Sequence, residues 1–138
     1  MRIVFDTSAL AKRYLVERGT ERVVELCVQA DEVVVSVLCV PEMFSGLNRL
    51  RRDGSLSAEQ YRRLKKEFAA DLAQATVAAI TPSVLTKAIA ALEASALRAL
   101  DAVHVATAQD CACDLFVSAD LRQCGAAKAL GLTTEHVG

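Results

Sequence analysis

The chain has 138 residues, of which 53% are hydrophobic and only 4% aromatic, and its formal net charge is -1. This length fits a single domain, residues 1–138, with a core of alanine, valine and leucine. The charge argues against a chain that binds nucleic acid over its whole surface, and no apolar run approaches the roughly 18 residues of a membrane span.

The start of the chain and its cysteines indicate where the protein works. Met1-Arg2 leads straight into an apolar strand instead of a signal-peptide pattern, so we expect a cytoplasmic protein. The five cysteines form no paired framework, as expected for reduced thiols. Cys111 and Cys113 make a C-x-C sequence, but no second pair stands at zinc spacing. We therefore interpret all five cysteines as small apolar residues.

Strands and helices alternate along the whole sequence. We expect strands at 2–5, 33–35, 76–80, 115–117 and 133–136. We expect helices from Ser8 to the break at Gly19, and then at 20–30, from 37–41 to 53, 57–72, 82–94, 97–112 and 121–130. This order predicts an α/β protein in which helices cover both faces of a mostly parallel sheet of four or five strands.

Four acids stand beside apolar runs that belong in a core. Asp6 and Asp120 come just after the first and fourth strands, at the edge where open α/β sheets bind ligands. Glu42 and Asp101 stand near the starts of helices. If these carboxylates meet, they repel one another unless they are protonated or hold a cation. A divalent metal is the simplest explanation.

Each acid also has a purely structural interpretation. Asp6 and Asp120 could cap helices, and Glu42 could be an acid that the helix dipole favours. Asp101 could pair with Arg98 at the surface, although Arg98 is also a candidate phosphate contact. Four such acids together are better explained as oxygen ligands of Mg2+ or Mn2+, which activate water and orient a phosphodiester for hydrolysis.

Histidine and basic residues complete the sequence pattern. The chain has two histidines, so zinc is the poorer choice of metal, and we expect His104 to be packed in a helix. The segment between Arg49 and Lys66 is locally positive by five charges, with Arg49, Arg51 and Arg52 as candidate nucleic-acid contacts. Its alternative interpretation is a solvated helix face.

Four motifs give the chain a family resemblance. They are VFDTSAL at 4–10, PEMFSGLNR at 41–49, LRALDAVHVATA at 97–108 and FVSAD at 116–120. With these motifs in this order, nearly the whole chain resembles the PIN-domain family, and within it the VapC-type toxins of bacterial type II toxin-antitoxin pairs. One departure is Pro41, which precedes Glu42 where such chains more often carry a helix former.

The resemblance implies a PIN-like three-layer α/β sandwich and a metal-dependent endoribonuclease using Mg2+ or Mn2+. It further implies a homodimer and a small VapB-type antitoxin that occupies the groove of the site. The residues that it implies as catalytic and metal-ligating are Asp6, Glu42, Asp101 and Asp120. The polar neighbours that it implies are Ser8, Arg98 and Ser118.

Other functions compete with this one. A phosphatase of the haloacid dehalogenase type would use Asp6 as a phosphorylated nucleophile, but it needs D-x-D and position 8 is serine. A receiver-like phosphoacceptor domain needs an acidic pair ahead of the phosphorylated aspartate and a later lysine in the site, and the sequence shows neither at a recognisable position. The main alternative is a catalytically silent PIN-fold binding module that acts through a complex of antitoxin and DNA.

Overall fold

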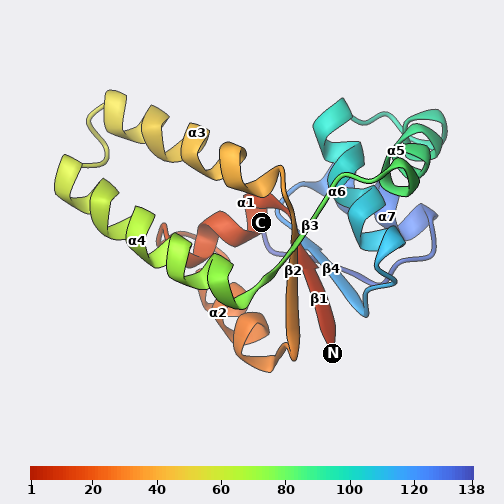
Figure 1. The fold of residues 1–138 in the computed structure, drawn as a ribbon, viewed down its shortest axis with the longest axis horizontal. Helices are drawn as coiled ribbons and strands as arrows, with labels where there is room; N and C mark the ends of the chain where they lie inside the picture. Colours follow the sequence, from red (N-terminus) through yellow and green to blue (C-terminus); the bar gives the residue numbers. More distant parts are fainter.

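Five parallel strands form the centre of the molecule in the order β3-β2-β1-β4-β5 (Figure 1). The computed structural model describes residues 1–138. The strands are β1 (Arg2–Phe5), β2 (Glu32–Ser36), β3 (Thr76–Ala78), β4 (Leu115–Ser118) and β5 (Thr134–His136). The helices are α1 (Thr7–Leu10), η1 (Ala11–Arg13), α2 (Thr20–Gln29), α3 (Cys39–Arg52), α4 (Ala58–Gln74), α5 (Pro82–Ala94), α6 (Ala99–Asp110) and α7 (Leu121–Ala129).

Helices cover both faces of the sheet, which confirms the expected three-layer α/β architecture. Ile3 and Phe5 of β1 point into a core shared with α1 to α4, whereas Val4 points to the opposite face, against α6 and α7. Figure 1 shows these two helix groups on opposite sides of the strands. A third apolar cluster joins α5 to α6. No helix is long and apolar enough to cross a membrane.

The chain order reverses between β1 and β4, and this reversal positions the site. The connections from β1 to β2 and from β2 to β3 run over one face, and the later connections run over the other. Val4 pairs with Phe116 and Phe5 with Val117, so the residues after β1 and β4 emerge side by side. This is the switch point at which open parallel sheets bind ligands.

The first helix differs most from its expectation. Instead of one helix from Ser8 to Gly19, α1 has a single turn followed by the turn η1, and Asp6 caps it. Gly19 precedes α2 with φ of 96°, and a Cβ there would lie 2.1 Å from the Val137 carbonyl oxygen. Gly19 is therefore required by a close approach of two backbones as well as by its conformation.

Other boundaries shift by a few residues. The strand expected at 76–80 ends at Ala78, and the helix expected at 97–112 spans Ala99–Asp110. Ser57 forms a capping box with Gln60 at the start of α4. In α2, Val23 and Leu26 are buried, whereas Val24 and Val28 are exposed.

Candidate active site

Asp6 is a buried carboxylate at the carboxyl end of β1. Its side chain is 1% exposed and caps α1 by accepting a hydrogen bond of 2.9 Å from the Ala9 N–H. The hydroxyls of Ser8 and Ser118 donate to it at 2.8 and 2.7 Å. Burial raises the pKa of Asp6, and the hydrogen bonds from Ser118, Ala9 and Ser8 oppose that rise. The structural interpretation, a helix cap, is therefore correct for this acid.

Two serines connect Asp6 to the end of β4. The Ser118 hydroxyl that donates to Asp6 also accepts from the Asp120 N–H at 2.9 Å, and the Ser8 hydroxyl accepts from the Ala119 N–H at 3.0 Å. Asp120 in turn caps α7, since its Oδ1 accepts from the Arg122 N–H at 2.9 Å. Ser8 and Ser118 thus lie beside the acids, as the sequence motifs implied.

Glu42 is held from two directions in the first turn of α3. Its Oε1 accepts from the Thr7 hydroxyl at 2.7 Å and lies 2.5 Å from Nε2 of His104. Because an ionised carboxylate only accepts, Nε2 carries the proton of this bond. His104 is 2% exposed, and its Nδ1 has no partner. The hydrogen bond from His104 lowers the pKa of Glu42.

Asp101 lies in the first turn of α6, where the charges of other acids affect its pKa. Its Oδ1 accepts from Nε2 of Gln123 at 3.1 Å. Burial is the largest cause of its raised pKa, and the charges of Asp120 and Glu42 raise it further. Arg98 is exposed and lowers the same pKa through its charge, but it makes no ion pair with Asp101. The structure therefore brings the acids close enough to interact.

The donor set suits a hard divalent cation. All four acids offer oxygen, and three of them, Glu42, Asp101 and Asp120, each keep one carboxylate oxygen that no protein group donates to. Their mutual repulsion is what a cation would relieve. In the conformation observed, no three metal-ligating side chains converge on a single point.

A groove runs beside the acids between α1 and α3. It has a volume of about 350 Å³, and its lining includes Thr7, Ser8, Glu42 and Arg49. Arg49 is thus the basic residue that lines this groove. Arg51 and Arg52 lie further along α3 towards its exposed tip, where the guanidinium of Arg51 lies 5.1 Å from the Tyr61 ring centroid.

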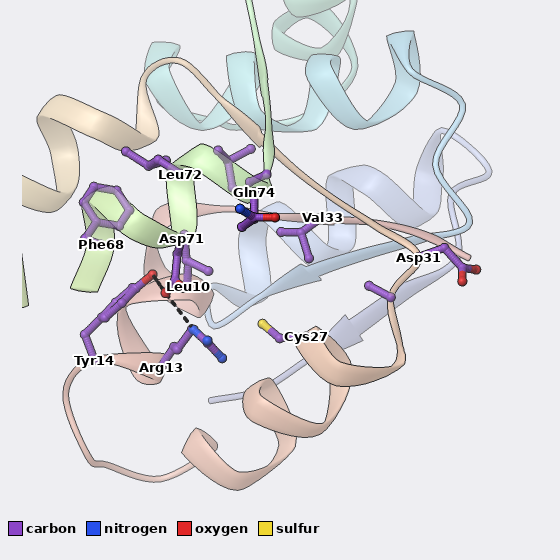
Figure 2. A pocket seen from close by; sticks show the side chains of 13 residues that line it. Leu10, Arg13, Tyr14, Cys27, Asp31, Val33, Phe68, Asp71, Leu72 and Gln74 are labelled. Atoms are coloured by element: carbon purple, nitrogen blue, oxygen red, sulfur yellow. Dashed lines mark hydrogen bonds and ion pairs between the residues drawn. The ribbon is translucent and has the colours of Figure 1, made fainter. Parts of the chain in front are cut away.

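A second pocket, of about 340 Å³, lies away from the acids among α1, η1, α2, α4 and β2 (Figure 2). Its wall is mostly apolar, with Leu10 and Phe68 among the side chains. Asp71 accepts hydrogen bonds from Arg13 Nε at 2.9 Å and from the Tyr14 hydroxyl at 2.6 Å, which ties α4 to η1. Figure 2 shows this polar triad at the pocket wall.

Three residues of the site were not assigned to it from sequence. His104 was expected to be packed, which is correct, but its bond to Glu42 joins residues 62 positions apart. Thr7 and Gln123 contact acids through pairings that no periodicity reveals. Thr7 directly follows Asp6 in the D-T-S sequence, and His104 comes three residues after Asp101 on the same helix. This proximity to the acids in the sequence was the signal that could have assigned both residues to the site.

Comparisons with known proteins agree with this geometry. The family model described as PIN domain matches residues 3–129. FitAcB from Neisseria gonorrhoeae is 18% identical with a TM-score of 0.75, covering 96% of this chain and 95% of that chain. VapC20 from Mycobacterium tuberculosis, described as a sarcin-ricin loop cleaving toxin, is 17% identical with a TM-score of 0.66, covering 90% and 94%.

A third similar structure is VapBC2 from Rickettsia felis, bound to a DNA fragment from its promoter. It is 9% identical with a TM-score of 0.72, covering 99% of this chain and 98% of that chain. The comparison with curated proteins gave no match. At these identities the solved structures establish the shared fold.

Proposed function

This chain belongs to the PIN domain family, and from that premise we propose that it is a metal-dependent endoribonuclease and the toxin of a type II toxin-antitoxin pair. The observation that carries the proposal is the nearness of Asp101 to Asp120 and Glu42 at the end of the sheet where Asp6 is also buried. The charges of Asp120 and Glu42 raise the pKa of Asp101 there. Carboxylates that repel one another lower the stability of the fold unless a cation or a proton neutralises them. Groups with pKa values shifted in this way are concentrated at functional sites.

Asp6, Glu42, Asp101 and Asp120 would hold Mg2+ or Mn2+ through their oxygens. When bound, such an ion lowers the pKa of water and stabilises the leaving oxygen of a phosphodiester. The chain's own residues keep the carboxylates in place. Ser8 of α1 and Ser118 of β4 fix Asp6, while Thr7 and His104 orient Glu42 and leave its second oxygen free.

The groove beside the acids is the proposed path of the RNA backbone. Arg49 lines this groove together with Glu42 and Ser8, so a phosphate held by its guanidinium would lie near the carboxylates. Arg51 and Arg52 extend the positive charge along the same helix, and exposed Arg98 is placed at the start of α6. These four arginines would position RNA without reading its sequence.

We propose two protein partners as well. A small VapB-type antitoxin would occupy the groove and block the acids, in keeping with the toxin-antitoxin assemblies among the similar structures. A second copy of the chain would cover an apolar stripe on α5. Leu85, Ile89 and Leu92 lie on one face of that helix and are 49%, 57% and 41% exposed.

Cleavage of total RNA by the purified chain tests the proposed activity. We expect cutting with Mg2+ or Mn2+ that EDTA abolishes and that the Asp6→Asn variant lacks, with its fold checked by circular dichroism. Asp110→Asn is the matched control, because Asp110 is an exposed acid paired with Lys87 at the other end of α6. Equal cleavage by Asp6→Asn and the unchanged protein would refute the assignment of the site.

The same assay separates nuclease from binding module. If no RNA is cut with either metal, the catalytically silent alternative gains support, and operator DNA binding by the antitoxin complex becomes its test. The promoter DNA in the Rickettsia felis structure is the observation that favours this alternative.

A further inference from the structure

Two cysteines flank one residue in the turn that ends α6, at the sheet edge opposite the acids. Ala112 in this turn has φ of 51°, and the N–H groups of Ala112 and Cys113 donate to the carbonyls of Gln109 and Ala108 at 3.2 and 3.3 Å. This is a Schellman turn with alanine where glycine is usual. The Cα atoms of residues two apart are separated by at most about 7 Å, so Cys111 and Cys113 are within disulfide reach.

The surroundings of the two thiols make them unequal. Both are free and only half-buried. The neighbouring Cys113 thiol is the largest cause of a pKa of Cys111 lowered to about 7, and the Arg2 guanidinium contributes to the same lowering. The Cys111 thiol donates to the Ala108 carbonyl oxygen at 3.6 Å within the same turn. Nη1 of Arg2 lies 2.5 Å from the Cys111 carbonyl oxygen, which fixes the cation beside this residue. The pair therefore combines an activated thiolate with a neighbouring thiol, the arrangement of a nucleophilic and a resolving cysteine.

We propose that Cys111 and Cys113 form a reversible thiol-disulfide modification site whose co-reactant is a low-molecular-weight disulfide of the glutathione type. The Cys111 thiolate attacks one sulfur of that disulfide, whose S–S bond breaks and releases one thiolate. Cys113 then loses its proton and attacks the Cys111 sulfur, which releases the second thiolate. The two protein thiols are oxidised to one disulfide, and the small disulfide is reduced to two thiols that take up both protons.

The other three cysteines do not compete. Cys39 and Cys124 are buried, and burial raises the pKa of Cys39 to about 12. Burial also raises the pKa of Cys27, which is half-buried at the apolar pocket of Figure 2. Cys27 is therefore the internal reference for reactivity. Because the cysteine pair lies at the amino ends of β1 and β4, the proposal does not depend on nuclease activity.

Mass spectrometry of the full chain, incubated with glutathione disulfide at pH 7 under native conditions, tests the site. We expect the intact mass to fall by two hydrogens and peptide mapping to join Cys111 to Cys113. Cys111 should react at least about tenfold faster than Cys27, because its thiolate fraction outweighs the lower nucleophilicity of a low-pKa sulfur. Cys113→Ser keeps a hydroxyl donor and should stop at a stable glutathione adduct on Cys111.

Cys27→Ser is the matched control and should still form the disulfide at the unchanged rate. Preferential modification of Cys27, or a lasting glutathione adduct on Cys111 in the unchanged chain, would overturn the proposal. Absence of reaction at Cys111 in the folded chain would overturn it as well. If Cys113→Ser fails to fold, peptide mapping of the unchanged chain decides the matter alone.

Discussion

Ser118 at the end of β4 donates a hydrogen bond of 2.7 Å to Asp6, which follows β1 and lies 112 positions earlier in the chain. The same hydroxyl accepts the Asp120 N–H at 2.9 Å. One serine therefore joins two acids across the switch point of the sheet. Because Asp6 is almost fully buried, its ionised form depends on the donors around it.

Ser118→Ala should destabilise the protein by about 2 kcal/mol at pH 7, since it leaves a buried carboxylate without one donor. The loss should be smaller at pH 4, because a protonated Asp6 needs that donor less. Urea unfolding at the two pH values measures both losses. Ser83→Ala is the matched control, since Ser83 donates to Asp110 on the surface at 2.7 Å and its removal should cost little at either pH.

Asp6→Asn should make the protein more stable while abolishing cleavage. The pKa of Asp6 is raised, so the folded state binds its proton more tightly than the unfolded chain does, and stability falls as pH rises through the folded pKa. Asparagine does not ionise, so the variant keeps this stability at high pH, and its side chain still caps α1. We expect a gain of about 1 kcal/mol at pH 8 that vanishes at pH 3, measured by urea unfolding. A less stable variant at pH 8 would contradict this account.

Much of the fold could be predicted because its strands are short, apolar and β-branched. Val33, Val34 and Val35 form a strand packed on both faces, which only a sheet covered by helices on each side explains. The first helix could not be predicted, because its length depends on tertiary contacts. Leu10 is buried under the sheet, and the chain then turns at η1 to reach the close approach at Gly19.

The candidate site was predictable as a set of residues but not as a set of contacts. Asp6 and Asp120 act as helix caps and also stand at the switch point, so the capping interpretation is correct for them, while their role as metal ligands stays a prediction. The proposed pairing of Asp101 with Arg98 is absent, and Gln123 takes that place. Such long-range pairings depend on how α6 and α7 pack, which local patterns do not encode.

The bond between His104 and Glu42 should contribute about 2 kcal/mol, the usual size for a hydrogen bond to a charged group. A double-mutant cycle of His104→Gln and Glu42→Gln, followed by urea unfolding, measures it. The pKa of Glu42 is lowered by His104, so this contribution is present above the unfolded pKa and is lost as pH falls through the folded one. The coupling should therefore be present at pH 7 and absent at pH 3.

A surface pair provides the comparison for that cycle. Arg63 and Glu67 are 3.8 Å apart on α4, with side chains that are 67% and 54% exposed. Their coupling should stay below about 0.5 kcal/mol. Equal couplings for the two pairs would show that His104 does not hold Glu42.

Arg49→Ala should weaken binding of single-stranded RNA and make it less dependent on salt. A lost phosphate contact lowers the slope of log affinity against log salt by about 0.7 for a single strand. Fluorescence anisotropy across a salt series, with the inactive Asp6→Asn variant as background, measures that slope. Arg63→Ala lies outside the groove beside the acids and should leave the slope unchanged. The same slope for both variants would place the RNA elsewhere.

Ile89→Glu should convert the proposed dimer to a monomer. Ile89 is 57% exposed between Leu85 and Leu92 on the outer face of α5, so a charge there would be buried without a partner if a second copy covers the stripe. Light scattering coupled to size-exclusion chromatography should show half the mass of the unchanged protein, with similar thermal stability of each subunit. Val28→Glu is the matched control, because Val28 is 80% exposed on α2 and lies far from this stripe in sequence. If both variants keep the mass of the unchanged chain, the stripe on α5 is not the interface.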